Sequence, residues 1–153
     1  MTRAGLPLVL IASIALAAPA VAAPKVLETK FVVLQDGKVT ETSRVPLIPD
    51  DVCFQWHIRL DVPDGPVEFT EVFTLPAAPD IWDTGPDGGV EISEDGATST
   101  VVDTYDVRNG WLLHGWCIAE GDPLGPHKME ISVEGTLLHT FVFQVIEPGT
   151  VYL

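Results

Sequence analysis

The sequence predicts an all-β protein, a single β-sandwich of about seven to nine antiparallel strands, with a small barrel as the alternative. Short segments in which apolar and polar residues alternate run through the chain from residue 26 onward. Turn-forming Asp-Gly, Asn-Gly and Pro-rich stretches separate these segments at regular spacing. Outside the first 22 residues, no segment places its apolar residues at a helical period.

The N-terminal segment has the features of a secretory signal peptide. Arg3 precedes an apolar run from Leu6 to Ala18, and small residues follow at Ala20-Val21-Ala22. The run is shorter than the ~20 apolar residues that a membrane-spanning helix needs. We expect cleavage after Ala22, which leaves a mature domain of residues 23–153 that does not insert into the membrane. The protein is therefore expected to be periplasmic or secreted.

The chain is strongly acidic, with 8 Lys and Arg residues against 22 Asp and Glu residues and a formal net charge of −14. Removal of the signal peptide also removes Arg3, which makes the mature domain one unit more negative. Nucleic acids and anionic membrane surfaces are therefore not expected as partners, because both carry negative charge. An acidic surface suits cationic partners or metal ions, but solubility in an extracytoplasmic or salty environment is the preferred explanation, since net charge governs association and solubility rather than fold.

The N-terminal third of the domain contains three of the expected strands. Val26–Gln35 ends at an Asp36-Gly37 turn, which is typical of a β-hairpin, and Lys38–Thr42 is expected to return beside it. A proline-containing loop leads to Val52–Leu60, where every second residue is large and apolar. The inward positions of that strand are Phe54, Trp56, Ile58 and Leu60, and the outward ones are Cys53, Gln55, His57 and Arg59.

The middle of the chain supplies further strands around a long loop. Val67–Leu75 alternates except at Glu71, a charged residue where the pattern expects an apolar one. A loop rich in Pro and Gly, Pro76–Gly89, follows it. Beyond the loop, Val90–Ser93 and Thr98–Val107 are strand candidates.

The densest apolar segment of the mature chain lies between Gly110 and Val145 and is expected to form three consecutive strands. Glu134-Gly135 marks a hairpin between the last two. With a plain two-residue turn, the apolar faces of these strands would disagree. An extra residue at the turn, with Gly135 in the left-handed conformation, brings the faces into agreement. The expected cross-strand pairs are therefore Ile131 with Leu137, Met129 with His139, and His127 with Phe141.

The same segment carries a resemblance to a protein family. Gly125-Pro126 precedes a strand, Ile131–Gly135 ends in a Val-x-Gly turn, and Phe141–Val145 closes the domain with a Phe-x-Phe-x-Val strand. This arrangement resembles bacterial exported immunoglobulin-like β-sandwich domains of unknown function. The resemblance implies an immunoglobulin-like fold and no particular chemistry, because a fold does not determine a function.

Cys53 and Cys117 are the two cysteines of the chain. In an oxidising compartment we expect a disulfide between them that joins an early strand to the start of the apolar segment. Closing a loop of about 65 residues contributes roughly 4 kcal/mol in the chain-entropy model. Because Cys53 alternates with polar residues, the bridge is expected on an outer face or at a local bulge. A redox or metal-binding pair is the alternative, and it lacks Cys-x-x-Cys spacing.

In the expected hairpin register, His127, Met129 and His139 lie on one face. Two imidazoles and a thioether are ligands that suit copper. The same face also carries large apolar residues, so the alternative is that all three side chains are packed in the core.

A second candidate metal site lies in the long loop. Asp80, Asp83, Asp87 and Glu91 flank its Gly-rich part, and carboxylates in such a loop suit calcium. Their spacing differs from that of the helix-loop-helix calcium site, and an acidic surface loop is the alternative. We expect no resident cofactor.

No catalytic motif is found, since the sequence contains neither Gly-x-Ser-x-Gly nor His-Glu-x-x-His. We therefore expect a non-enzymatic binding or structural module of the cell envelope, with an envelope protein or a glycan as partner. Sandwich domains commonly bind through end loops and edge strands, and Ile81 and Trp82 are the expected contact residues. Alternatively, Trp82 folds back onto the sandwich. The alternative function is a small metal (copper or calcium) or ligand carrier.

Overall fold

The computed structural model describes residues 22–84 and 89–150. The expected signal peptide, residues 1–22, lies outside this range except for Ala22. Within the described residues, every regular element is a β-strand and no helix occurs. That part of the chain therefore has no helix long and apolar enough to cross a membrane.

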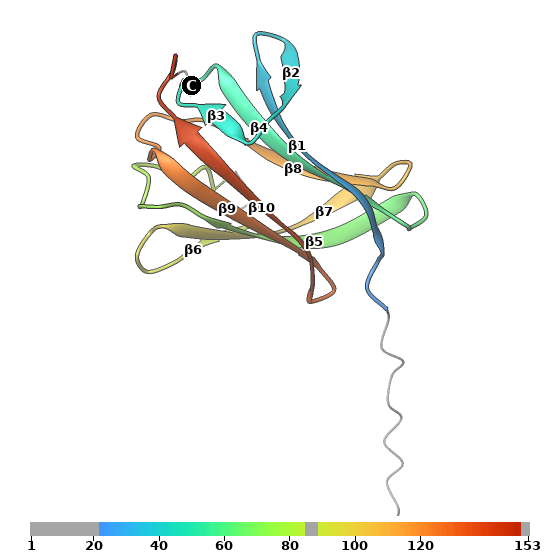
Figure 1. Cartoon of the computed structure of the whole chain (residues 1–153). Coiled ribbons are helices and arrows are strands. Elements are labelled where there is room, and N and C mark those ends of the chain that lie inside the picture. The colour runs from blue at the N-terminus through green and yellow to red at the C-terminus, as the bar shows by residue number, and fades with distance from the viewer. Residues whose placement is uncertain (1–21, 85–88, 151–153) are drawn as a thin grey trace, which may run out of the picture.

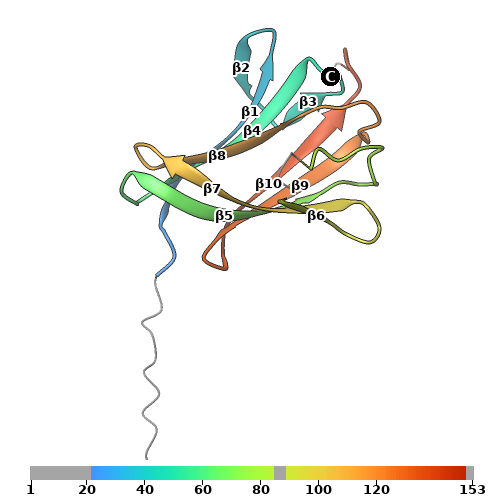
Figure 2. The ribbon, with the colours of Figure 1, turned by 180° about the vertical axis from the view of Figure 1, so that it is seen from behind.

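In the described part of the chain, ten strands form two sheets that face each other (Figure 1). The four-stranded sheet has the order β2 (Lys38–Glu41), β1 (Val26–Gln35), β4 (Val52–Leu60), β8 (Trp111–Cys117). The six-stranded sheet has the order β3 (Arg44–Pro46), β10 (Thr136–Ile146), β9 (Gly125–Val133), β5 (Gly65–Thr74), β7 (Thr98–Val107), β6 (Val90–Ile92). Figure 2 shows both layers from behind, with the consecutive strands β7 and β8 in different sheets. The predicted all-β sandwich is confirmed.

Strand β3 corrects the sequence prediction in two respects. It lies in a segment predicted as loop, and it runs parallel to β10 where only antiparallel pairs are expected. With three residues it is too short to show an alternation, although Val45 is fully buried. Pro46 is tolerated because β3 is at the edge of its sheet, where a missing backbone N–H breaks few ladder bonds.

The core lies between the sheets and is built from the inward residues of the long strands. In β4 the inward positions are buried as the alternation predicts: Phe54, Trp56, Ile58 and Leu60. Phe31 of β1 stacks on Phe143 of β10 with the ring centroids 4.6 Å apart, which joins the two sheets. Sheet packing therefore follows directly from the period-2 pattern.

The β9–β10 hairpin closes with a plain two-residue turn, so the predicted bulged turn is wrong. Glu134 and Gly135 both have positive φ, 50° and 75°, which is the conformation of a type I′ turn. Val133 pairs with Thr136 across this turn. The turn is thus the plain two-residue type, with which a regular pairing of the two strands would leave their apolar faces in disagreement.

The extra residue lies farther along β10. The register shifts between Leu137 and His139, which leaves Leu138 without a ladder partner. Beyond this bulge the pairs are Ile131 with His139, Met129 with Phe141, and His127 with Phe143. All three predicted pairs are therefore wrong. A bulge within the strand reconciles the apolar faces as well as a bulge at the turn does, and the alternation alone does not distinguish the two.

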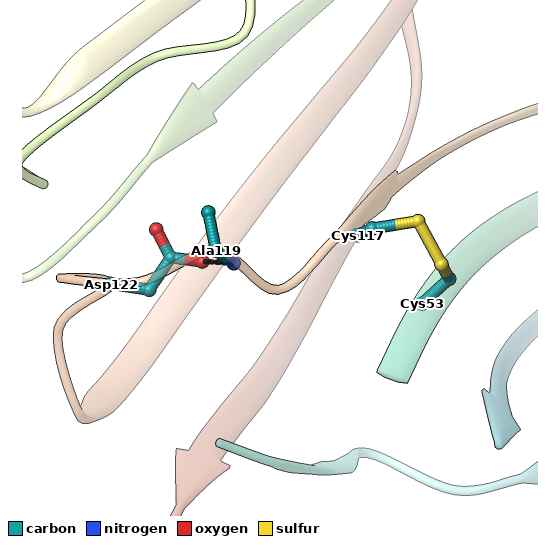
Figure 3. Close-up of a disulfide and its surroundings, with 4 residues drawn as sticks. All are labelled: Cys53, Cys117, Ala119 and Asp122. Carbon is teal, nitrogen blue, oxygen red and sulfur yellow. Dashed lines mark hydrogen bonds between the residues drawn. A yellow bond between two sulfur atoms is a disulfide. The ribbon is translucent and has the colours of Figure 1, made fainter. Parts of the chain in front are cut away.

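Cys53 and Cys117 form the predicted disulfide (Figure 3). The two residues are directly opposed on the neighbouring strands β4 and β8, 64 positions apart in the chain. The bridge lies on the outward face of β4, as the alternation of this strand indicates. Just beyond β8, the backbone N–H of Ala119 donates to a carboxylate oxygen of Asp122 at 2.8 Å, and burial raises the pKa of that carboxyl.

Candidate functional site

A charged side chain lies in the middle of the apolar core. Glu71 is on the inward face of β5 between Phe69 and Phe73, and its side chain is fully buried. This is the residue at which the sequence alternation breaks. A buried carboxylate is costly unless hydrogen-bond donors surround it, so the fold must supply such donors here.

Three side chains from the opposite sheet surround the Glu71 carboxylate. The indole N–H of Trp116 donates to Oε1 at 2.7 Å, and the indole N–H of Trp56 donates to Oε2. Nδ1 of His114 lies 3.0 Å from the same Oε2. Trp56 lies on β4, whereas His114 and Trp116 lie on β8. The network therefore joins the two sheets through a polar centre inside the core.

The protonation of His114 depends on this centre. Burial alone would lower the pKa of His114, but the hydrogen bond and the negative charge of Glu71, with the charge of Asp103, raise it above its ordinary value. An imidazolium next to a carboxylate is a favourable ion pair in a partly buried setting. The arrangement therefore favours a protonated His114.

Gly115, between His114 and Trp116, allows β8 to lie close to β4. A Cβ atom at this position would come within 2.5 Å of the backbone oxygen of Phe54. Any other residue would push β8 away from β4, together with the two side chains that reach Glu71. The site therefore requires a glycine at position 115, because a residue without a side chain lets β8 lie close to β4.

A cavity of about 390 Å³ opens beside the network, between β7 and β8. Trp116 and His114 form part of its wall, and the carboxyl-bearing residues Asp83 and Asp103 form another part. None of the described residues that line it is Lys or Arg. The rest of the lining is Thr84, Gly89, Val90, Val101, Val102 and Gly115.

The lining combines aromatic, apolar and carboxyl-bearing side chains with the hydroxyl of Thr84. The buried carboxylate of Glu71 already accepts two indole N–H groups and contacts an imidazole. Volume, aromatic surface and a few placed polar groups are the usual features of a ligand pocket.

The structure does not bring the predicted copper ligands together. The cross-strand partner of His127 is Phe143, four residues beyond His139. At about 3.3 Å per residue, the backbone positions of His127 and His139 are therefore roughly 13 Å apart along the strands. Burial lowers the pKa of His127, whose Nδ1 lies 2.9 Å from the carbonyl oxygen of Gly125. The site of His127, Met129 and His139 depended on the predicted register and loses its geometric basis.

The predicted calcium ligands are only partly described. Asp80, Asp83 and Glu91 belong to the described residues, and Asp87 lies outside them. Within residues 22–84 and 89–150, no group of three or more His, Cys, Asp or Glu side chains could hold a metal ion. Asp83 lies instead in the wall of the cavity beside β8.

The two residues predicted to contact a partner differ in their surroundings. Ile81 is 69% exposed. Trp82 folds back onto the sandwich, where its ring packs edge-on against Phe73 and Trp116, and its indole N–H donates to the backbone oxygen of Gly96 at 2.8 Å. Trp82 therefore supports a wall residue of the cavity, and only Ile81 keeps the exposure that a contact surface requires.

Sequence reasoning missed Glu71, His114 and Trp116 as a connected set. A signal was present, because Glu71 interrupts an apolar pattern and the other two residues share one face of a strand. Glu71 is 43 positions from His114 and 45 from Trp116, and the two strands belong to different sheets. The connection therefore depends on how the sheets stack, which the alternation does not specify.

Comparison with known proteins identifies the fold. The model of the PM0630 beta sandwich domain family matches residues 29–146. An immunoglobulin-like protein of Pseudomonas aeruginosa, PA1606, is similar at a TM-score of 0.56 and 16% sequence identity, over 84% of this chain and 100% of that chain. This likeness confirms the predicted immunoglobulin-like sandwich.

Another solved structure shares less with this chain. The alkylpurine DNA glycosylase AlkC of Pseudomonas fluorescens, bound to DNA containing an abasic site analog, matches at a TM-score of 0.36 and 12% identity. The match covers 77% of this chain and 30% of that chain. No curated protein matches this sequence.

Proposed function

This chain belongs to the PM0630 beta sandwich domain family, and from this starting point we propose that it is a non-enzymatic binding module of the cell envelope. The proposed partner is an extended segment of another envelope protein, which adds as a strand to the free edge of β8. Strand addition takes its affinity from backbone hydrogen bonds and its specificity from pockets for side chains. The edge of β8 offers backbone groups for the hydrogen bonds, and the cavity beside it offers a pocket for side chains.

The sequence of β8 carries this proposal. Natural proteins usually protect sheet edges with charged residues, with proline or by keeping the edge strand very short. Among the described strands, the edges at β2, β3 and β6 have three or four residues, and each contains a charged residue or a proline. The edge strand β8 has seven residues, WLLHGWC, without Lys, Arg, Asp, Glu or Pro. It is therefore the edge that is suited to accept another strand.

Alternate residues of β8 direct backbone groups toward this edge. The Cα atoms of Cys53 and Cys117 are 3.9 Å apart, the short separation of a pair that does not exchange ladder hydrogen bonds. Since the ladder alternates, Gly115 and Leu113 belong to the same kind of pair. Their N–H and C=O groups point away from β4, where an added strand would meet them.

The cavity lies on the side of β8 that an added strand would occupy. Its wall includes His114–Trp116 from β8 and Val101–Asp103 from β7. An extended chain places alternate side chains on opposite faces, so every second side chain of an added strand would point toward this wall. Backbone pairing and side-chain recognition would then occur together.

A proline substitution tests strand addition. Leu113→Pro removes an N–H that points to the free edge and leaves the ladder bonds to β4 in place. Leu113→Ala is the matched control, because it shortens the same side chain and keeps the N–H. A benzoylphenylalanine crosslinker at Val102, which is 53% exposed and lines the cavity, reports the partner in the envelope fraction of the source cells.

We expect the protein with the crosslinker at Val102 to capture one envelope protein, and the same protein with Leu113→Ala to capture it as well. The protein with Leu113→Pro should fail to capture it, although its melting temperature is unchanged. The same label at Val39 on β2, which is 64% exposed, should capture nothing. The proposal would be contradicted if a folded Leu113→Pro variant still captured the partner. It would also be contradicted if the crosslinker at Val39 captured as much protein as the crosslinker at Val102.

The volume of the cavity favours a second candidate, a carrier of a small organic ligand. Pockets for such ligands range from about 300 to 1,000 Å³, and this cavity has about 390 Å³. A copper or calcium carrier has less support, since the described residues contain no suitable group of metal ligands. Native mass spectrometry of the protein from its envelope fraction tests the carrier, which predicts a stoichiometric organic adduct. Protein without any adduct would contradict it.

A further inference from the structure

The charged groups around the cavity between β7 and β8 are mostly acidic. Asp83 and Asp103 belong to the lining, and none of the described lining residues is Lys or Arg. His114 adds at most one positive charge, and the carboxylate of Glu71 lies beside its ring. The cavity wall is therefore negative whether His114 is protonated or neutral. The whole chain has a formal net charge of −14, which adds to this potential.

The negative charge of Asp103 acts on His114 across the cavity wall. Its charge contributes to the raised pKa of His114, which lies on the other strand of the cavity wall. One of its carboxylate oxygens accepts the backbone N–H of Thr104 at 2.7 Å, which holds the side chain in place. A positive group that enters the cavity would therefore meet a carboxylate that is already oriented.

The aromatic side chain of Trp116 lines the same cavity. The indole of Trp116 is fixed by its hydrogen bond to Glu71, and the rings of Trp82 and His114 pack edge-on against it at 5.9 Å and 5.8 Å between centroids. The faces of indole rings attract cations. Because the ring is held before any ligand arrives, little side-chain entropy is lost on binding.

A metal ion does not suit these groups. The described residues hold no group of three or more His, Cys, Asp or Glu side chains that could bind one metal ion. A cation that contacts both the carboxylates and the indole must therefore be larger, with a positive group that donates several hydrogen bonds. Guanidinium and ammonium groups have this property.

We infer that the cavity binds the positively charged end of an Arg or Lys side chain, with Asp103 and Asp83 as hydrogen-bond acceptors and Trp116 as the aromatic surface. This inference rests on the proposed function, because the side chain belongs to the segment that adds to β8. The partner segment should accordingly be extended and should carry a basic residue among the side chains that face β7.

A pair of small probes tests the inference on the whole mature protein. n-Butylguanidinium has the charge of an arginine side chain, and n-butylurea is its neutral analogue of nearly the same shape. The readout is the indole N–H resonance of Trp116 and the ring resonances of His114 in NMR titrations. We expect saturable shifts with n-butylguanidinium, weaker at high salt because screening shortens the range of the attraction, and no such shifts with n-butylurea.

Variants of β7 give the matched control. Asp103→Asn should weaken the binding of n-butylguanidinium about ten-fold, since it removes a charged acceptor. Asp106→Asn removes the same charge from a position on the same strand that is outside the cavity lining, and it should change binding by about two-fold or less. Shifts of equal size with n-butylurea, no shifts with either probe, or equal effects of the two variants would each overturn the inference.

The two proposals fail in different ways. If strand addition is wrong, the crosslink at Val102 is insensitive to Leu113→Pro, whatever the probes do. If strand addition is right and only the preference of the cavity for a cation is wrong, Leu113→Pro still abolishes the crosslink at Val102. In that case Asp103→Asn changes neither the crosslink nor the NMR titration with n-butylguanidinium. Binding of n-butylguanidinium without any crosslinked protein would indicate that the cation is a free small molecule, which also overturns the inference.

Discussion

The indole nitrogen of Trp116 lies 2.7 Å from Oε1 of Glu71, so the edge strand β8 of one sheet is hydrogen-bonded through the core to β5 of the other. Trp116 also lines the cavity between β7 and β8. The contact that joins the sheets is therefore the contact that fixes a wall of the proposed binding site. Changes to this carboxylate should affect both stability and binding.

Replacing Glu71 should destabilise the fold in a graded way. In Glu71→Gln, the amide has one acceptor oxygen, so one of the two indole N–H groups loses its acceptor, which costs about 1–3 kcal/mol. Glu71→Ala removes the acceptor of every donor and should cost about 3–5 kcal/mol. Urea unfolding measures both. Glu68→Gln, on the outward face of the same strand, should change stability by about 0.5 kcal/mol or less. Wild-type stability of Glu71→Ala would contradict the network.

The stability that His114 contributes should depend on pH. Its pKa is raised in the folded protein, so the contribution is complete below the ordinary value of 6.5 and is lost as the pH rises through the folded value. His114→Gln should therefore lower the free energy of unfolding more at acidic than at alkaline pH. Denaturant unfolding of both proteins across this range is the measurement.

His127 supplies a control of opposite sign. Burial lowers its pKa, so its contribution is complete above 6.5 and is lost as the pH falls through the folded value. The difference between the wild type and His127→Gln should therefore shrink on acidification, whereas that for His114→Gln grows. Parallel trends in the two variants would show that the pH dependence does not arise from these imidazoles.

Gly115→Ala should destabilise the protein although it adds only one methyl group. The new Cβ would lie 2.5 Å from the backbone oxygen of Phe54, so β8 must shift away from β4. Overpacking of this kind typically costs about 1–3 kcal/mol. Thermal unfolding measures the loss, and Thr104→Ala on the exposed part of β7 is the control with little expected change. A melting temperature equal to that of the wild type would show that β8 has room to move.

Removing the disulfide should weaken the fold without changing its topology. The bridge closes a loop between residues 64 apart, for which the chain-entropy model gives about 4 kcal/mol. The double variant Cys53→Ala with Cys117→Ala should lose about this much in urea unfolding. The wild type with reductant should lose a similar amount. If reduction had no effect while the double variant unfolded, packing of the cysteine side chains would be the cause.

Much of the fold follows from the sequence because the alternation along Val52–Leu60 is unambiguous. Trp56 is predicted as inward and is fully buried, and Cys53 is predicted as outward and bonds to Cys117 on the outer face. The type I′ turn at Glu134-Gly135 and the bulge at Leu138 do not follow from the alternation. Both a bulged turn and a bulged strand satisfy the same apolar pattern, so the register is decided by backbone geometry that the pattern does not contain.

The candidate site was less predictable than the fold. The interrupted alternation at Glu71 marks a polar group in the core, and that much is visible in the sequence. Its donors come from β4 and β8 of the other sheet, and only the stacking of the sheets selects them. The two predicted metal sites stand differently. The copper site depended on a register that is wrong, whereas the calcium site includes Asp87, which lies outside the described residues.

A strand paired on one side only protects half of its amide protons. In β8, the N–H groups of Leu112, His114 and Trp116 point to β4, while those of Leu113 and Gly115 point to the open edge. Hydrogen exchange with solvent should therefore alternate between slow and fast along this strand. An added strand would cover the fast positions and erase the alternation. Loss of this odd-even pattern would reveal an occupied edge even when the occupant is not identified.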